Sequence, residues 1–524
     1  MDLRRYQVDC SEAIEEHLLN HRSTLAVLAT GLGKTVVFAD VIRRRAGFGR
    51  AMVLAHRKEL INQAAEKIAW VTGMPVDVEM ADRRASSLIR SPVIVSSIQT
   101  QISGGIDNKR MHLFDPMEFG TLVIDEFHHG TADSYRTVAN HYLQNPALKM
   151  LGVTATPKRN DRLALGSVIE SCAFTMGIRD GIGEGWLVPL KVRRVKVAGL
   201  DLSNVTTVAG DFNQGQLGKV MGADEITKAT ALATMEHSQG RKTLVFCASV
   251  DQARIISAYL NGHRQDSSRF LCGETPDDER DSIVDDFRKS RYQYLVNYSV
   301  LLEGFDVWDV ACVVNARPTK NSLLLEQMIG RGTRPNAEIL EGVEDAPTRR
   351  GLIETSVKPD TIVVDFMGRI GAHKLAKLTD VLGGNIPDDV RELAETKINN
   401  GCDSVDAAIE QARAELIPIK VAGKVKYSGA VEVFDLFGMD REVGSSPVED
   451  WQKEKLEKWR IPLPDSGEEA DAIIEEVRSR TRKGLVTYRM ARTLKRYGYP
   501  TDMSFKEGHS VMDALANNGW RPIR

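Results

Sequence analysis

The sequence predicts an α/β fold in which two successive parallel sheets are followed by a mostly helical C-terminal region. Short apolar runs alternate with amphipathic helical stretches from the N-terminus to about residue 370. Such alternation is typical of parallel sheets that are covered by helices on both faces. A Gly/Pro-rich stretch near residues 382–387 ends this pattern, and helical periodicity predominates beyond it.

The composition is that of a globular protein and excludes several classes. Of the 524 residues, 42% are apolar and 27% are charged, no apolar run is long enough to cross a membrane, and the N-terminus lacks an apolar signal core. The six cysteines contain no C-x-x-C pair, which argues against a zinc site or a disulfide framework and favours a cytoplasmic setting. Because the net charge is −3, any nucleic-acid binding would depend on local basic patches.

The first half of the chain contains several apolar runs that are predicted as buried strands. These runs are Leu25–Leu28, Arg50–Ala55, Pro92–Ser97, Thr121–Asp125 and Met150–Thr154. Helices are expected over residues 36–42 and 58–71 between them. Since ligands of open α/β sheets bind at the carboxyl ends of the strands, polar residues directly after these runs are the candidates for a site.

The most informative strand end is the run Ala29-Thr30-Gly31-Leu32-Gly33-Lys34-Thr35. A Gly-rich turn between a strand and a helix points N–H groups and the helix dipole at a phosphate chain. Lys34 can reach the outer phosphates, and the Thr35 hydroxyl can ligate Mg²⁺. The general phosphate-binding pattern has a Gly where this chain has Leu28, so alone the run is also compatible with a Gly-rich turn carrying a surface lysine. Together with the residues below, it predicts ATP as the ligand, with Mg²⁺.

Two acids follow the predicted strand at residues 121–125. Asp125 is suited to holding Mg²⁺ through water, and Glu126 is suited to orienting or deprotonating an attacking water. The alternative is a strand that ends in a solvated acidic turn. The phosphate-binding turn upstream favours the catalytic interpretation.

Hydroxyl, amide and basic groups follow the other strands and are suited to phosphate contacts. Each of them is equally compatible with a purely structural role. They are His56 and Arg57 after the second strand, Gln99 and Thr100 after the third, and Thr154 and Thr156 after the fifth.

A second alternating unit begins near Arg241 and has no second phosphate-binding turn. Its predicted strands are Thr243–Cys247, Tyr294–Val296, Cys312–Asn315 and Thr361–Asp365. A turn between two of these strands carries Gly304 and Asp306, which are suited to sensing a nucleotide across a cleft.

This unit also carries a pair of arginines within an apolar helical pattern. The helix that begins near Ser322 is expected to continue through Arg334, which would place Gln327, Arg331 and Arg334 on one face. Two guanidiniums on one face form a site for the charge of a transferring phosphoryl group. Gly330 and Gly332 each cost about 1 kcal/mol inside a helix, which indicates a close approach of another backbone or a ligand.

Taken in chain order, these residues resemble the motifs of superfamily 2 helicases and translocases of the DExH type, which include DEAD/DEAH-like proteins and type III restriction motors. Residues 5–7 (Arg-Tyr-Gln) resemble the adenine-reading Q motif, residues 29–35 motif I, residues 125–128 motif II, and residues 327–334 motif VI. Looser matches are residues 54–57 to motif Ia, 97–100 to the next strand-binding motif, 154–156 to motif III, 243–249 to motif IV and 303–306 to motif V. His129 is assigned no role.

The resemblance implies two tandem RecA-like domains, residues 1–198 and 199–375, with ATP in the cleft between them and a mostly helical accessory domain over residues 376–524. It implies that Lys34, Glu126, Arg331 and Arg334 act in hydrolysis. The implied binding and coupling residues are Gln7, Thr30, Gly31, Leu32, Gly33, Lys34, Thr35, Gly304 and Asp306 for ATP, Thr35 and Asp125 for the metal, His128, Thr154, Thr156 and Gln327 for coupling, and His56, Arg57, Gln99 and Thr100 for the nucleic acid.

These features favour an ATP-dependent helicase that moves along a nucleic acid and has no membrane partner. The DEFH and EGFD sequences, at residues 125–128 and 303–306, favour DNA over RNA. One alternative is a motor that translocates on duplex DNA without separating its strands, as in a restriction or remodelling complex. A second alternative is a nucleotide-gated module that binds nucleic acid without processive movement. No protein partner is identified.

The C-terminal region combines helical stretches with a basic cluster. Helices are expected over residues 388–416, 470–480, 487–497 and 503–518, and a short β element over residues 421–438. Between Arg478 and Arg496 the chain has eight Arg and Lys residues and no acid. This cluster is compatible with a duplex- or partner-binding surface, and equally with a helical domain that only packs on the motor.

Overall fold

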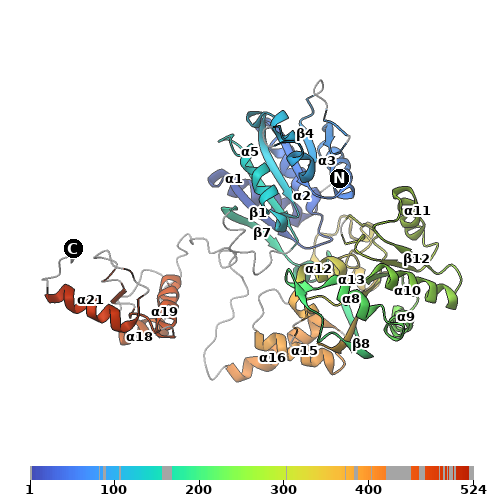
Figure 1. The fold of residues 1–524 in the computed structure, drawn as a ribbon. Helices are drawn as coiled ribbons and strands as arrows, with labels where there is room; N and C mark the ends of the chain where they lie inside the picture. The colour runs from blue at the N-terminus through green and yellow to red at the C-terminus, as the bar shows by residue number, and fades with distance from the viewer. Residues whose placement is uncertain are drawn as a thin grey trace. The chain divides into compact units, whose positions relative to one another are not determined.

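The structure is a computed structural model of the chain (Figure 1). It describes residues 3–81, 83–85, 90–105, 108–130, 132–155, 168–302, 304–371, 373, 375–382, 388–402, 404–420, 450–459, 467–482, 484–487, 490, 491, 494, 500 and 503–517. Two compact units are present, residues 1–439 and residues 440–524. Among the described residues, no helix is long and apolar enough to cross a membrane.

The N-terminal half folds around a parallel sheet. Within the described ranges, seven strands pair in the order β3-β4-β2-β5-β6-β1-β7, and every pairing between neighbours is parallel. The strands are β1 (Ser23–Leu28), β2 (Arg50–Ala55), β3 (Val76–Glu79), β4 (Val93–Ser97), β5 (Phe119–Asp125), β6 (Lys149–Thr154) and β7 (Ser171–Met176). The five strands expected from apolar runs are thereby confirmed, and β3 and β7 are additional.

Helices cover both faces of this sheet, as the alternation of elements predicted (Figure 1). Alternate residues of a strand point to opposite faces, so Val53 and Val123 pack in one core while Leu54 and Ile124 pack in the other. The helices are α1 (Arg5–Asn20), α2 (Lys34–Arg44), α3 (Lys58–Thr72), which share the first core, and α4 (Ile98–Ile102) and α5 (Asp133–Tyr142), which share the second.

A second parallel sheet follows, which confirms the expected pair of α/β domains. In the described part of the chain its order is β12-β13-β11-β14-β15-β8. The strands are β8 (Leu190–Asp201), β11 (Thr243–Cys247), β12 (Ser268–Leu271), β13 (Tyr294–Asn297), β14 (Cys312–Ala316) and β15 (Thr361–Arg369), and a separate antiparallel ribbon contains β9 (Thr207–Val208) and β10 (Asp211–Phe212). The expected boundary at residue 198 falls inside β8, which pairs with β15. The domain limits otherwise stay predictions.

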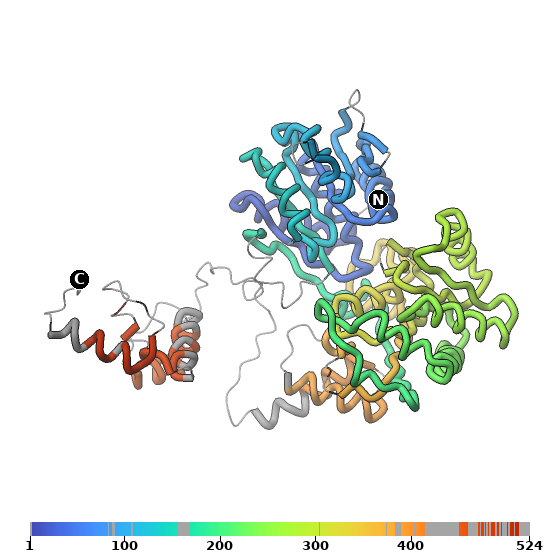
Figure 2. Tube along the Cα trace, viewed as in Figure 1, coloured from blue at the N-terminus to red at the C-terminus, as the bar shows by residue number. Residues whose placement is uncertain are grey.

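Helices also surround the second sheet, and one helix, α7, comes before its first strand in the chain. They are α7 (Ile178–Gly183), α8 (Gln214–Met221), α9 (Asp224–Ser238), α10 (Val250–His263), α11 (Asp277–Arg288), α12 (Ser322–Gly330) and α13 (Ala346–Glu354). In the tube of Figure 2 the described segments of the first sheet are coloured from blue to teal, and those of the second from green to yellow.

The region after residue 375 is divided between the two compact units. The helices α15 (Asp388–Asn399) and α16 (Val405–Lys420) confirm the expected helical stretch, and α14 (Leu378–Leu382) is additional. Apolar residues of all three, such as Leu378, Val390 and Ile409, belong to the large core of residues 1–439. A buried ion pair of 2.7 Å between Arg194 of β8 and Glu395 of α15 fixes them there.

The second unit contains α18 (Asp450–Lys458), α19 (Gly467–Arg482) and α21 (Phe505–Asn517). Small apolar clusters hold it together, one of them made by Leu456, Ala470 and Ile474. The β element expected over residues 421–438, most of the helix expected over 487–497 and most of the basic cluster lie outside the described residues.

The turn after β5 is held in place by Phe127, whose ring fills a notch, the space left by the absent side chain of Gly152. Phe127 is fully buried, and a Cβ atom added at Gly152 of β6 would lie 2.6 Å from its Cγ atom. Only a glycine therefore leaves room for the ring on the neighbouring strand. The ring in turn fixes the position of the polar residues on either side of it, Glu126 and His128.

We expect Gly152→Ala to destabilise the fold by about 1–3 kcal/mol, because the added methyl group overpacks the core against Phe127. Thermal unfolding measures this change. Gly351→Ala in α13 is the matched control, since a Cβ atom there meets nothing within 4 Å and alanine is about 1 kcal/mol better in a helix. Equal melting temperatures for Gly152→Ala and the wild type would contradict the account of the notch.

Candidate nucleotide-binding site

The predicted phosphate-binding turn lies between the end of β1 and the start of α2. Gly31 and Gly33 have φ angles of +98° and +75°, a region that favours glycine. Gly33 is the N-cap of α2, so the N–H groups of the first helical turn point toward the phosphate-binding turn. This combination of N–H donors and helix dipole is suited to a phosphate chain.

The first helix braces this turn. The Tyr6 hydroxyl donates to the Leu32 carbonyl at 2.8 Å, and Gln7 Nε2 lies 3.5 Å from the same carbonyl. A Cβ atom at Gly33 would lie 2.7 Å from Gln7 Nε2. The Oε1 atom of Gln7 accepts from the Arg4 backbone N–H at 3.0 Å. Gln7 therefore touches the turn, and its predicted contact with adenine stays a prediction.

A buried ion pair joins the phosphate-binding turn to the end of β5. Lys34 Nζ lies 3.2 Å from Glu126 Oε1, and the two side chains are only 13% and 9% exposed. Glu126 has a left-handed backbone with φ of +49°, which is uncommon for a residue with a side chain and typical of strained functional positions. Burial raises the pKa of Glu126, but the charges of Lys34 and His128 outweigh burial and hold that pKa well below its usual range.

A histidine links this carboxylate to the next strand. His128 Nδ1 lies 3.3 Å from Glu126 Oε2 and 3.3 Å from the Thr154 hydroxyl at the end of β6. Since β5 and β6 are neighbours in the sheet, their carboxyl ends bring the three side chains together. Thr156, the other predicted coupling residue of this segment, lies outside the described residues.

The residues predicted to hold Mg²⁺ supply hard oxygen ligands. Asp125 is buried at the end of β5, where its Oδ1 atom accepts from the Glu126 N–H at 2.9 Å, and Thr35 is in the first turn of α2. Among the described residues, no group of three or more His, Cys, Asp and Glu could hold a metal ion by itself. Mg²⁺ commonly binds through one or two protein ligands together with substrate phosphates, and this donor set fits that pattern.

The helix that carries the predicted arginines ends earlier than expected. α12 stops at Gly330, and Arg331 is its C-cap, so Gln327, Arg331 and Arg334 do not share one helical face. The expectation of a continuous helix was wrong, because Gly330 and Gly332 each pack closely against a residue that is distant in the sequence. A Cβ atom at Gly330 would lie 2.5 Å from Thr30 Cβ, and one at Gly332 would lie 2.6 Å from Thr361 Cγ2.

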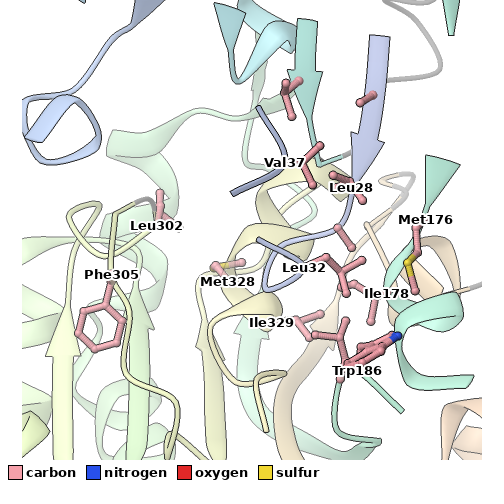
Figure 3. Close-up of a cluster of buried hydrophobic side chains, with 14 of the residues drawn as sticks. Leu28, Leu32, Val37, Met176, Ile178, Trp186, Leu302, Phe305, Met328 and Ile329 are labelled. Atoms are coloured by element: carbon pink, nitrogen blue, oxygen red, sulfur yellow. The ribbon is translucent and has the colours of Figure 1, made fainter. Parts of the chain in front are cut away.

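The turn after α12 therefore packs against the phosphate-binding turn. Thr333 Oγ1 lies 3.5 Å from the Thr30 carbonyl, and a Cβ atom at Gly31 would lie 3.3 Å from Arg334 Cγ. Figure 3 shows the apolar side of the same junction, with Leu32 beside Ile329.

The two arginine head groups are directed to the loop after β13. Arg331 donates to the carbonyls of Leu302 and Phe305, the latter at 2.9 Å, and Arg334 pairs with Asp306. Burial lowers the pKa of Arg334 to about 10, so the group stays charged near neutral pH.

The predicted ATP-binding residue Gly304 faces a different element. Its carbonyl accepts a hydrogen bond from Gln63 of α3, and a Cβ atom at Gly304 would lie 3.2 Å from Glu59 Cβ. The structure thus places Gly304 against α3, whereas Asp306 joins the arginines. A role for either at ATP stays a prediction.

The predicted nucleic-acid residues lie at the carboxyl edge of the first sheet. His56 and Arg57 follow β2 and are partly buried, and Gln99 is exposed. Thr100 is buried, and its hydroxyl takes part in hydrogen bonds with Ala81 N at 3.0 Å and Ser97 Oγ at 2.7 Å. The Thr100 side chain therefore supports a turn of the protein.

One buried acid near this site is not evident from the sequence motifs. Glu326 precedes Gln327 in α12 and is only 5% exposed. Burial raises its pKa to about 8; the charge of Lys34 opposes this rise and the charge of Glu126 adds to it. The signal in the sequence is that Glu326 lies among Leu, Met and Ile residues. This pattern predicts a carboxylate on a buried helix.

Comparisons with known proteins agree with this architecture. Residues 1–159 match the family model of the res subunit of type III restriction enzymes, and residues 225–336 match the helicase conserved C-terminal domain. IRC3 of Saccharomyces cerevisiae, provisionally named an ATP-dependent helicase, is 31% identical over 72% of this chain and 57% of its own length. The type I restriction enzyme EcoAI endonuclease subunit of Escherichia coli is 26% identical over 63% of this chain and 44% of its own length.

A solved structure shares the fold. It is a fragment of a protein provisionally assigned as an HsdR subunit of a type I restriction enzyme from Vibrio vulnificus YJ016, with a TM-score of 0.51, 20% identity, and coverage of 72% of this chain and 66% of that chain. The chain spans about half the length of the two curated relatives.

We expect Glu326→Gln to change how stability depends on pH. A carboxyl group with a pKa of about 8 in the folded state and an ordinary value near 4.5 binds more protons folded than unfolded, so the free energy of unfolding falls as pH rises through this window. The variant should match the wild type near about pH 5 and exceed it by about 1 kcal/mol or more near pH 9. Urea unfolding at both values measures this difference.

Glu354→Gln, at an exposed position of α13, is the control and should show no such pH-dependent difference. A Glu326→Gln variant whose difference from the wild type is the same at both pH values would contradict the assigned environment.

Proposed function

We propose that this chain, which belongs to the superfamily 2 helicase-like ATPases, hydrolyses ATP to move along a nucleic acid, with DNA preferred over RNA. The observation that carries the proposal is the buried pair of Lys34 and Glu126, 3.2 Å apart. It unites a cation suited to the outer phosphates with a carboxylate suited to the attacking water.

ATP binding would break this pair. The phosphates would occupy the turn at residues 30–35, where the N–H groups of α2 and the Lys34 ammonium would meet them. Lys34 would then leave Glu126, and the pKa of Glu126 would rise because its main cationic partner has moved. Glu126 would thereby become better able to orient a water and to accept its proton as the bond between the γ-phosphorus and ADP breaks.

Magnesium would enter with ATP. Asp125 and Thr35 would hold it, and bound Mg²⁺ neutralises charge on the phosphate oxygens. These two residues stand at the end of β5 and the start of α2, the elements that also carry the ion pair. The protein would thus present metal ligands and catalytic groups from one edge of the first sheet.

The second domain would supply the remaining positive charge. Arg331 and Arg334 contact the loop after β13 in the present arrangement, and we propose that they turn to the γ-phosphate when ATP is bound. Loss of that phosphate on hydrolysis would release them again. Two arrangements of one domain relative to a bound phosphate are the basis of a stepping motor.

Coupling to the nucleic acid would pass through groups between the two sites. We propose this role for His128, Thr154 and Gln327, and also for Thr156. His128 supports it because it lies within 3.3 Å of both Glu126 and Thr154. The strand itself would run over the carboxyl edge of the first sheet near His56, Arg57 and Gln99.

A second candidate is a motor that translocates on duplex DNA without separating strands. The similarity to a type I restriction enzyme subunit favours it. Both candidates share the ATP site and differ in the form of DNA that stimulates it. A cytoplasmic setting also remains a proposal, supported by six free cysteines.

We expect Lys34→Ala to lower ATP turnover at least about 100-fold, because the cation that neutralises the transferring phosphate is removed. Glu126→Gln should lower turnover to a similar extent while ATP still binds. Phosphate release and equilibrium binding of a fluorescent ATP analogue measure the two effects. Lys219→Ala, at an exposed position of α8, should leave both unchanged. Near-normal turnover by Lys34→Ala would contradict the proposal.

We expect DNA to accelerate ATP turnover by the wild-type protein more than RNA does. Turnover measured separately with single-stranded DNA, duplex DNA and RNA separates the candidates. Stimulation by single-stranded DNA together with unwinding of a partial duplex supports the helicase, and stimulation by duplex DNA without unwinding supports the translocase. Stimulation by RNA alone would overturn the preference for DNA.

A further inference from the structure

The second histidine after β5, His129, makes ring contacts with histidines of two different segments. Its ring centroid lies 4.1 Å from that of His128 and 4.8 Å from that of His56, with an angle of 67° between the planes of the His129 and His56 rings. We infer that His129 is a positioning residue that transmits the state of the ATP site to the end of β2, where the nucleic acid is proposed to bind. This inference rests on the proposed function.

The contacts form an unbroken path that starts at the nucleotide. Lys34 lies 3.2 Å from Glu126, and Glu126 lies 3.3 Å from His128. The rings of His128, His129 and His56 then follow in succession. All of these residues belong to the first domain, so the path does not depend on the position of the second.

The topology of the sheet explains why the three rings meet. β2 and β5 are parallel neighbours in register, with Leu54 opposite Ile124, so the segments after them leave the same edge of the sheet side by side. The turn after β5 is short, and the His129 N–H donates to the Glu126 carbonyl at 3.0 Å. This hydrogen bond ties the backbone of His129 to that of Glu126.

The surroundings of the His129 ring limit the directions in which it can move. Besides the two histidines, the ring of Tyr135 is stacked against it, with centroids 6.4 Å apart and planes at 19°. Tyr135 belongs to α5 and is itself buried. His129 is exposed at the protein surface. Because its ring contacts both histidine rings, a shift of the His128 ring would be passed to His56.

The far end of the path is suited to a polyanion. His56 is followed by Arg57, which is the N-cap of α3. Arg57 thus adds a cationic side chain directly beside His56 at the end of β2. The phosphate backbone of a nucleic acid is the chemical class that such an end would contact.

A change of charge at the start of the path supplies the driving event. When Lys34 turns to ATP, Glu126 loses its main cationic partner. The attraction between Glu126 and His128 then becomes stronger. His128 would be drawn toward Glu126, and His129 would follow because their rings are in contact. The coupling between nucleotide and nucleic acid would then be lost, without loss of hydrolysis, when the middle ring is removed.

Three variants of the full chain test this inference: His129→Ala, His129→Phe and His112→Ala. His129→Phe keeps a ring of similar size. His112→Ala is the control, because His112 also contacts a histidine ring, that of His141 at 5.6 Å, at another place in the same domain. Each variant is assayed for ATP turnover with and without single-stranded DNA, for DNA affinity with ADP and with a non-hydrolysable ATP analogue, and for thermal stability.

We expect His129→Ala to keep its basal turnover within about twofold and to lose about fivefold or more of its stimulation by DNA. The difference in DNA affinity between the two nucleotide states should shrink by a similar factor. His129→Phe should recover most of both effects, and His112→Ala should match the wild type.

Full stimulation of His129→Ala by DNA would overturn the inference while leaving the proposed function intact. An equal fall of basal and stimulated turnover would also overturn it, because His129 would then act in hydrolysis or folding. A wild-type protein that no nucleic acid stimulates would overturn the proposed function itself, and the inference with it.

Discussion

The buried ion pair of Lys34 and Glu126 is the interaction on which the rest of the site depends. Either charge alone would be costly to bury, and together at 3.2 Å they satisfy each other. The pair fixes the start of α2 relative to the end of β5, two segments about ninety residues apart in the chain. A phosphate chain could replace Glu126 in this pair, since it would offer Lys34 a stronger anionic partner than one carboxylate.

Close packing at glycines holds this pair in position. Gly152 admits the Phe127 ring and thereby fixes the turn that carries Glu126. Gly330 admits Thr30 and brings the turn after α12 onto the phosphate-binding turn. In both cases the absence of a side chain on the glycine allows a close contact, and this contact sets the position of a charged residue nearby. Close packing at glycines therefore determines the geometry of the polar site.

The parts of this structure that could be predicted from sequence are those with a local cause. Apolar runs ending in polar residues revealed most strands, because a buried parallel strand needs apolar side chains on both faces. β8 was overlooked because charged residues such as Arg193, Arg194 and Lys196 interrupt its pattern at the edge of the sheet. The end of α12 was misjudged because the contacts of Gly330 and Gly332 are tertiary, and helical periodicity in the sequence does not reveal them. Glu326 and His129 were missed for the same reason, since their significance comes from neighbours distant in the chain.

In the proposed cycle, ATP replaces Glu126 as the partner of Lys34 and draws Arg331 away from the loop after β13. The decisive measurement is an experimental structure with Mg²⁺ and a non-hydrolysable ATP analogue. We expect Lys34 Nζ on a phosphate oxygen, Glu126 facing a water near the γ-phosphate, and the Arg331 guanidinium released from the carbonyls of Leu302 and Phe305. An analogue bound in the turn beside an intact pair of Lys34 and Glu126, with Arg331 still on those carbonyls, would contradict it.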